Sequence, residues 1–168
     1  IPLVFLHNIS GFMVGVSYEQ GGIAKDGAKM VNAVSTSRVP KFSVIVGGSY
    51  GAGAYAMCGR AFGPRLMAAW PNARTSVMGG EQAATVLALV REEQLARKGQ
   101  RFTPEDAEAY KQPLRARYAA ESTAVNAASK LWVDAVIDPA DTRAWLAMGL
   151  SLAAASPQQD TRFGVFRM

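Results

Sequence analysis

The residues with the clearest chemical capacity are the glycines that follow an apolar, β-branched run. The segment Gly47-Gly48-Ser49-Tyr50-Gly51-Ala52-Gly53 comes directly after Val44-Ile45-Val46 and before a series of small residues. Glycine lets the backbone take positive φ and approach a ligand closely, and the first N–H groups of a helix have no partner within it. Such N–H groups, helped by the helix dipole, bind negative charge. The spacing therefore predicts a strand, a tight turn and a helix start that holds an anionic group.

One interpretation of this turn is dinucleotide binding, because Gly51–Ala56 fits the pattern GxGxxA. That fingerprint also needs an Asp or Glu about 20 residues further on, at the end of the next strand. No acidic residue lies between Asp26 and Glu81, although Arg65 or Arg74 could serve an NADP site. A Rossmann-like dinucleotide-binding domain therefore stays open as an alternative.

A second interpretation is a serine nucleophile, because Gly47–Gly51 also fits GxSxG. The hydrolase order Ser, Asp, His cannot be met, since the single histidine, His7, lies upstream. We expect His7 to be a packed or hydrogen-bonded residue. A phosphate-binding loop of the Walker type is excluded because no Gly-Lys-Ser/Thr follows the glycines. A tight packing turn without a ligand is the remaining interpretation.

The composition predicts one globular domain and excludes several classes of partner. The chain has 168 residues, 49% of them hydrophobic, and no apolar run is long enough for a membrane span. Its net charge is +5, but the basic residues are spread, so we expect no nucleic-acid partner. Arg91–Lys98 mixes both signs at helical spacing, as a solvated helix face does. No cluster of His, Cys, Asp and Glu has metal-ligand spacing, and Cys58 is expected to be small buried filler.

The turn needs elements that position it, and the pattern predicts strands alternating with helices. We expect helices over residues 22–37, 81–98, 103–112, 114–129 and 138–155, with Pro113 as an interruption, and strands over 4–6, 43–46, 75–78 and 133–137. This alternation favours a parallel sheet with helical crossovers, an α/β fold. We interpret Val86, Leu87, Val90 and Leu95 as a core stripe, Glu81 as a favourable first-turn acid, and Phe163 and Phe166 as tail residues that pack on something.

Several blocks of the sequence occur in a familiar order. They are Asn8–Gly15, Gly21–Met30, Gly47–Gly53, Trp70–Arg74, Val77–Ala84, Val136–Arg143 and Phe163–Met168. In this order they resemble the carboxyltransferase β subunits of biotin-dependent acyl-CoA carboxylases, and most of all the 3-methylcrotonyl-CoA and geranyl-CoA carboxylase branch. The resemblance covers nearly the whole chain.

The resemblance implies a crotonase-like spiral of repeated strand-strand-helix units. In such subunits two domains of this kind follow each other, so residues 1–168 would be the C-terminal carboxyltransferase domain, truncated at its N-terminal end, with the N-terminal domain absent. The acyl-CoA would be held mainly by that missing domain and biotin mainly by this one. An isolated fragment is therefore expected to be inactive.

The resemblance also assigns roles to individual residues. The backbone N–H groups of Ala52 and Gly53 would form an oxyanion hole for the ureido oxygen of biotin, with Gly51 beside them, and Gly11 and Phe12 would border the biotin pocket. Biotin would be carried on a partner subunit, acyl-CoA would be the substrate, and no metal is expected in this domain. The implied partners are a biotin-carboxylase and biotin-carrier α subunit and further β subunits, in a hexamer.

Substrate and location follow from the same resemblance. Ala54 stands where the methylcrotonyl branch has asparagine, so the acyl group stays open between 3-methylcrotonyl-CoA and geranyl-CoA, with a propionyl- or acetyl-CoA-type carboxyltransferase as the alternative. No targeting signal is read at the start of the chain. We expect a cytoplasmic enzyme in bacteria and a mitochondrial matrix enzyme in eukaryotes, without contact to membranes.

Overall fold

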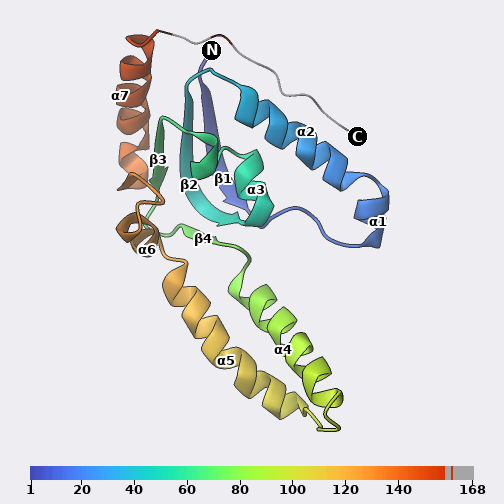
Figure 1. Ribbon diagram of the computed structural model, residues 1–168. Helices are drawn as coiled ribbons and strands as arrows, with labels where there is room; N and C mark the ends of the chain where they lie inside the picture. Colours follow the sequence, from blue (N-terminus) through green and yellow to red (C-terminus); the bar gives the residue numbers. More distant parts are fainter. Residues whose placement is uncertain (158–159, 161–168) are drawn as a thin grey trace.

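The computed structural model describes residues 1–157 and 160, and it consists of a parallel sheet between helices with a long helical hairpin at one end (Figure 1). In chain order the elements are β1 (Leu3–Ile9), α1 (Val16–Gln20), α2 (Ile23–Thr36), β2 (Lys41–Tyr50), α3 (Gly51–Ala56), η1 (Arg60–Phe62), β3 (Leu66–Ala69), β4 (Arg74–Ser76), α4 (Gly80–Ala96), α5 (Pro104–Glu121), α6 (Ala124–Ser129), β5 (Ala135–Val136), η2 (Pro139–Asp141) and α7 (Thr142–Ala154). Within this part of the chain no helix is long and apolar enough to cross a membrane.

The strands pair in parallel, as predicted, and follow the order of the sequence. The sheet runs β1-β2-β3-β5, and β4 also pairs with β2. The long strand β2 pairs with β3 along its first half and with β4 along its last three residues, so the turn at Trp70–Ala73 carries the chain along the same edge of β2. In the described part of the chain the strand order shows no reversal, which a doubly wound dinucleotide-binding sheet would need. The dinucleotide interpretation is therefore wrong.

The ladder between β1 and β2 contains a bulge just before the glycine turn. His7 pairs with Ile45, but Ile9 pairs with Ser49, so β2 has two more residues than β1 between these pairs. Residues 46–48 of β2 therefore lie out of the regular ladder with β1, and two of them are glycines. A bulge of this kind bends a strand and re-aims the chain that follows it.

Both faces of β2 are covered by helices. Phe42 is fully buried on the face covered by α7, where its ring leaves no room for a side chain at Gly149. Ile45 lies on the opposite face in a cluster of buried apolar residues: Met67, Ala69, Ala73, Ala124, Ala127 and Val133. The first half of the strand that leads into the glycine turn is thus fully buried, which fixes where the turn begins.

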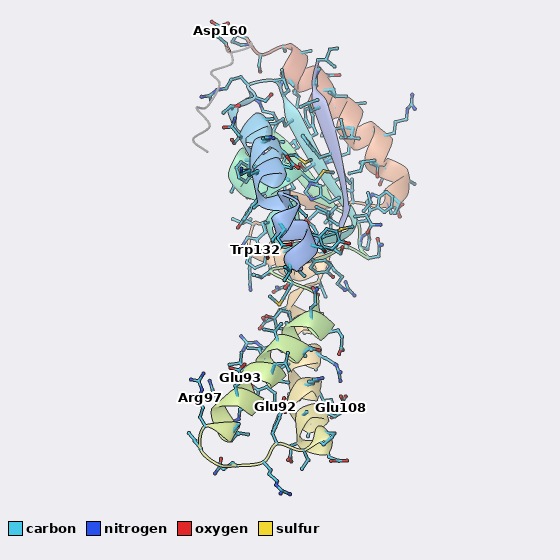
Figure 2. The ribbon with its side chains drawn as sticks, turned by 90° about the vertical axis from the view of Figure 1, so that its right-hand side faces the viewer. Glu92, Glu93, Arg97, Glu108, Trp132 and Asp160 are labelled. Atoms are coloured by element: carbon cyan, nitrogen blue, oxygen red, sulfur yellow. The ribbon has the colours of Figure 1, made fainter. Side chains whose placement is uncertain are left out.

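The helical hairpin of α4 and α5 extends away from the sheet (Figure 1). Figure 2 shows Glu92, Glu93 and Arg97 on the part of the hairpin remote from the sheet, in agreement with the predicted solvated face. Arg115 of α5 joins the two helices, because its guanidinium binds the carboxylates of Glu81 and Glu108.

The core stripe predicted for this hairpin is wrong. Val86, Leu87 and Val90 are 47%, 38% and 46% exposed and Leu95 is half-buried, whereas the buried residues of α4 are the alanines at positions 83, 84 and 88. Small side chains let α5 approach α4 closely, and the larger ones then point away from that contact. Apolar residues at helical spacing identified the helix but not its buried face.

Other boundaries also differ from the prediction. Helix α5 begins at the predicted Thr103 cap, which forms a capping box with Asp106, but it continues through Pro113. The helix ends instead at Ser122, where Thr123 caps α6 with its side chain. A mid-helix proline removes one hydrogen bond without always ending the helix. Here the packing of α5 against α4 offsets the bond that is missing at Pro113. The strand β3 and the short helix α1 were not predicted, and Phe163 and Phe166 lie outside the described residues.

Candidate anion-binding site at the turn between β2 and α3

The glycine turn joins the end of β2 directly to the start of α3. Tyr50 is still extended, with φ −118° and ψ 142°, and Gly51 is the first helical residue, with φ 59°. A Cβ on Gly51 would lie 3.1 Å from the carbonyl oxygen of Val77, in the segment that follows β4. Glycine is therefore required here by both the backbone conformation and the close approach of a second chain segment.

The start of α3 presents backbone donors. Ala52 and Gly53 lie in the first turn of the helix, where N–H groups have no intrahelical partner. Tyr50 provides no side-chain cap, and no hydrogen bond found in the described part of the chain uses either N–H. Ala52 is exposed and Gly53 is buried. The turn thus carries two neighbouring N–H groups without a partner in the described part of the chain, and of these Ala52 lines the adjacent pocket.

The structure brings the predicted loop at Gly11 against this turn. A Cβ on Gly53 would lie 3.3 Å from the Cα of Gly11 and 3.4 Å from Cγ2 of Ile9. Gly11 itself has φ 120°, a conformation that favours glycine. The ring of Phe12 lies over Gly27 of α2, where a Cβ would meet its Cζ at 3.1 Å. Gly11 therefore borders the turn, while Phe12 fastens the loop to α2.

Two asparagine side chains bind the bulge that precedes the turn. The Gly48 N–H donates to Oδ1 of Asn8 at 3.1 Å, and Nδ2 of Asn72 donates to the Val46 carbonyl oxygen at 3.2 Å. Asn8 belongs to β1 and Asn72 to the turn before β4. Backbone groups displaced from the ladder are thus paired from both neighbouring segments.

A histidine and a serine meet beneath the turn, which sequence order had not suggested. Nδ1 of His7 lies 3.0 Å from Oγ of Ser49, and Nε2 lies 2.6 Å from the carbonyl oxygen of Met57. Because a carbonyl only accepts, Nε2 carries the proton and Nδ1 accepts from the Ser49 hydroxyl. Burial lowers the pKa of His7, and the bond to Met57 raises it by a smaller amount.

This pair does not form a nucleophilic site. Ser49 borders a pocket beside α3, but only 1% of its surface is exposed, and its hydroxyl is bound to a fully buried His7. The Ser49 carbonyl oxygen accepts from Thr75 as well. His7 is thus the hydrogen-bonded packing residue that the sequence predicted, and it fixes the end of β2.

A pocket of about 550 Å³ opens beside α3. Its walls include Ala52, Ala54, Tyr55, Val77 and Trp132 and are largely apolar. Figure 2 places Trp132 at the end of the sheet region nearest the hairpin. The charge at the pocket edge is neutralised, because Arg60 binds Asp134 at 2.8 Å. An apolar wall next to free N–H donors suits a ligand with a small anionic group on a hydrophobic body.

The other candidates are structural. Cys58 is fully buried with φ 58°, and burial raises the pKa of its thiol, so it is the inert filler that was predicted. Glu81 lies in the first turn of α4 as expected but does not cap the helix. Its hydrogen bonds to Arg115 lower the pKa of its carboxyl. In the residues that the structure describes, no group of three His, Cys, Asp or Glu could hold a metal ion.

The comparison with known proteins gives one family. A family model described as carboxyl transferase domain matches residues 1–165. The β1 subunit of a biotin-dependent 3-methylcrotonyl-coenzyme A carboxylase from Mycobacterium tuberculosis is 58% identical over 168 residues, covering 100% of this chain and 32% of that protein. A probable mitochondrial methylcrotonoyl-CoA carboxylase β chain from Drosophila melanogaster is 54% identical over 168 residues, 100% of this chain and 29% of the relative. The chain spans about a third of the length of these relatives.

Two solved structures match the chain over a similar share of their length. The β subunit of geranyl-CoA carboxylase from P. aeruginosa has a TM-score of 0.84 and 45% identity, covering 99% of this chain and 32% of that one. The transcarboxylase 12S core, solved as a hexamer assembly with methylmalonyl-coenzyme A bound in hydrolysed form, has a TM-score of 0.78 and 37% identity, covering 100% of this chain and 30% of that one.

Proposed function

The chain belongs to the carboxyl transferase domain family and has its crotonase-like α/β fold, and from this premise we propose that it is half of the active site of a biotin-dependent acyl-CoA carboxylase. The reaction transfers a carboxyl group from carboxybiotin to a branched, unsaturated acyl-CoA. The chain would be the C-terminal carboxyltransferase domain of a longer β subunit, whose N-terminal domain supplies the rest of the site. The observation that carries the proposal is the pair of N–H donors at Ala52 and Gly53, in the first turn of α3, with no partner in the described part of the chain.

Biotin fits the groups that line this turn. Bound there, carboxybiotin would supply the carboxyl group, and its ureido oxygen would gain negative charge as that group leaves. Two neighbouring N–H donors can receive such a charge without a titrating side chain. The apolar wall formed by Tyr55, Val77 and Trp132 suits the hydrophobic body of the same ligand. The site residues proposed for biotin are therefore Gly11, Phe12, Gly51, Ala52 and Gly53.

The residues around the turn would act by positioning and by excluding water. Gly11 packs directly on Gly53 and limits the space above the donors. The Val77 carbonyl contacts Gly51 and fixes the turn from the other side. A donor pair held in place before the reaction stabilises developing charge without reorganisation, and one such donor typically contributes about 3–4 kcal/mol to the transition state.

Acyl-CoA is the proposed second substrate. The relative from Mycobacterium tuberculosis is named for 3-methylcrotonyl-CoA and the neighbour from P. aeruginosa for geranyl-CoA. Both acyl groups carry a branch at C3 and a double bond between C2 and C3, which conjugates the carbon attached to C3 with the thioester carbonyl. We therefore place the chain in the branch that acts on such acyl groups. Because the small side chain of Ala54 leaves space at the pocket wall, both 3-methylcrotonyl-CoA and geranyl-CoA stay open as substrates. A propionyl- or acetyl-CoA-type carboxyltransferase is the alternative.

The proposed partners follow from the incomplete site and the exposed surface. An α subunit would carry biotin, and further β subunits would complete a hexamer, the assembly in which the transcarboxylase 12S core was solved. Exposed apolar residues on β1 and α4, such as Leu6 and Val86, are consistent with such contacts. The proposed location is the cytoplasm of a bacterium or the mitochondrial matrix of a eukaryote, since the Drosophila relative is named as mitochondrial.

The proposal is tested by carboxyl transfer in the full-length β subunit. Purified subunit is mixed with carboxybiotin and with 3-methylcrotonyl-CoA, geranyl-CoA, propionyl-CoA or acetyl-CoA in separate reactions. We expect transfer to one of the two branched, unsaturated acyl-CoAs to exceed transfer to the short saturated ones. Absence of transfer to all four would contradict the proposed function, and preference for propionyl-CoA or acetyl-CoA would support the alternative.

A further inference from the structure

We infer that Asn8 and Asn72 are positioning residues that clamp the β2 bulge and thereby aim the backbone donors of the following turn. The inference rests on the proposed function of that turn and names residues to which the resemblance assigns no role. Neither side chain lies among the residues proposed to bind biotin. Both act on the strand that leads into the turn.

The bulge leaves backbone groups that the ladder cannot pair. Between the pairs His7 with Ile45 and Ile9 with Ser49, β2 contains three residues where β1 contains one. The Gly48 N–H is bound by the Asn8 side chain instead of by the backbone of β1, at 3.1 Å. On the opposite edge of β2, between the segments that pair with β3 and β4, the Val46 carbonyl is bound by Asn72 at 3.2 Å. Both bonds are exposed, so loss of either partner leaves the backbone group to water and removes a restraint on this segment.

The chemistry of the two contacts fixes which atom each asparagine uses. A backbone N–H can only donate, so Asn8 must present its oxygen to Gly48. A backbone carbonyl can only accept, so Asn72 must present its nitrogen to Val46. One amide thus works as an acceptor and the other as a donor. The same substitution, asparagine to aspartate, should therefore have opposite results at the two positions.

The glycine beside the clamp is fitted to it. A Cβ on Gly47 would overlap the Oδ1 and Cγ atoms of Asn8, so the bulge and the asparagine can occupy this arrangement only with glycine at position 47. Gly47→Ala should displace Asn8 and reproduce the loss of its amide, although the asparagine itself is unchanged. This gives a second, independent route to open the clamp.

The bulge is coupled to the donors by a rigid segment. Ser49 is bound through its side chain to His7 and through its carbonyl to Thr75, and residues 48–50 pair with β4. Ala52 follows three residues after Ser49 and Gly53 four. Gly48 belongs to this paired segment, so we infer that a shift at Gly48 moves Ser49 and Tyr50 with it and changes where these N–H groups point. A misplacement of about 1 Å in a catalytic arrangement can lower the rate about a hundredfold.

The experiment compares Asn8→Ala, Asn8→Asp, Asn72→Asp and Gly47→Ala in the full-length β subunit. The first readout is hydrogen–deuterium exchange of the peptide that contains residues 46–50, measured by mass spectrometry without substrate. The second is kcat and KM for carboxyl transfer. Asn32→Ala in α2 is the matched control, since no hydrogen bond of its amide is found in the described part of the chain.

We expect Asn8→Ala, Gly47→Ala and Asn72→Asp to raise exchange in this peptide and to lower kcat about tenfold to a hundredfold, with KM for acyl-CoA changed less than about twofold. Asn8→Asp keeps the acceptor and should keep the protection of the peptide and most of kcat. The Asn32 control should change neither readout.

Each failure has its own signature. Exchange that is unchanged in Asn8→Ala and Asn72→Asp would overturn the clamp, whatever the enzyme does. Raised exchange with unchanged kcat would overturn its positioning role. Equal behaviour of aspartate at the two positions would overturn the assigned donor and acceptor. Inactivity of the unsubstituted subunit would contradict the proposed function instead, and the exchange measurement would still decide on the clamp.

Discussion

The sheet region and the helical hairpin are built in opposite ways. In the sheet region the strand β2 is buried on both faces, and the turn after it is fixed by Gly11, Val77 and His7. In the hairpin the larger apolar side chains of α4 point outward, and an arginine with two carboxylates joins the helices at the surface. The difference teaches that β2 and the turn after it are packed by residues of this chain, while the outward apolar side chains of α4 have no cover among the described residues.

The difference between the sheet region and the hairpin should appear in how substitutions change activity and stability. If the turn is a fully packed site, changes there should affect activity and stability strongly. Changes on the hairpin should depend on whether they fall on the alanine contact with α5 or on the outward face.

The largest effect is expected from Gly53→Val. A Cβ at this position already meets Gly11 and Ile9 at 3.3 and 3.4 Å, and valine adds two methyl groups there. The turn must move, so at least one donor is lost, and we expect kcat for carboxyl transfer to fall by about a factor of 100 to 1,000. Steady-state kinetics of the full-length subunit measures this. Circular dichroism must show that the subunit is folded, and full activity in a folded variant would mean that the turn is structural.

The next largest effect is expected from His7→Ala on stability. The substitution removes the partner of the Ser49 hydroxyl and of the Met57 carbonyl at a fully buried position. We expect the free energy of unfolding to fall by about 3 kcal/mol, from two unpaired groups and a cavity. Urea unfolding of the full-length subunit measures the change. A loss below 0.5 kcal/mol, the range of surface substitutions, would show that this packing is not needed.

The same histidine gives the sheet region a pH dependence. Burial lowers the pKa of His7 below its ordinary value of 6.5, so the unfolded chain binds a proton more readily than the folded one. Its contribution to stability is therefore fully present above pH 6.5 and is lost as the pH falls from there through the lowered value. Thermal unfolding between pH 7.5 and pH 5, over about this window, should show a fall in Tm that His7→Gln reduces. An equal fall in both proteins would assign the effect to other groups.

Two substitutions on α4 separate its faces. Ala84 is fully buried, so Ala84→Leu should overpack the helix contact and cost about 1–3 kcal/mol. Val86 is 47% exposed, so Val86→Leu has room and should stay within about 0.5 kcal/mol. Urea unfolding of both variants measures the difference. A similar cost at both positions would show that the outward face is also packed in the full-length subunit.

The smallest effect is expected at the ion cluster. Arg115→Gln removes the partner of Glu81 and Glu108, which are largely exposed, and exposed ion pairs contribute little to stability. We expect a small decrease in Tm that disappears at high salt, because salt screens such pairs. If Arg115→Gln lowered Tm as much as His7→Ala does, the hairpin would depend on its surface ion pairs as strongly as the sheet region depends on its buried contacts, which would contradict the difference between the two regions.

Much of the sheet region could be predicted from the sequence because its signals are local. The β-branched run, the glycines and the following small residues predicted the order of strand, turn and helix, although β2 continues through the first glycines to Tyr50 and α3 begins already at Gly51. The contact of Gly11 with Gly53 followed only from the resemblance, since 42 positions separate them. The bond of Asn8 could not be predicted, because the bulge exists only once β1 and β2 pair out of register, and the bond of Asn72 forms only once the turn between β3 and β4 lies along β2.

For the hairpin, the sequence predicted the helices correctly but not which of their residues are buried. Periodicity identified α4, but it could not tell that alanines form the contact with α5, since both sets of residues are apolar. Proline chemistry suggested a break at Pro113, yet the helix continues to Glu121 because packing can offset one missing hydrogen bond. Four-residue β3 was missed because Leu66–Ala69 has no alternating pattern and becomes a strand only beside β2.

The most direct test of the central claim removes a single backbone donor and no side-chain atom. Incorporation of lactic acid in place of Ala52 replaces its N–H by an ester oxygen, and the same ester exchange at Gln82, in the first turn of α4, is the matched control. We expect kcat for carboxyl transfer by the full-length subunit to fall by about a factor of 100 to 1,000 at position 52 and to stay unchanged at position 82. Unchanged kcat with the ester at position 52 would contradict the account, because the turn would then hold no reacting charge.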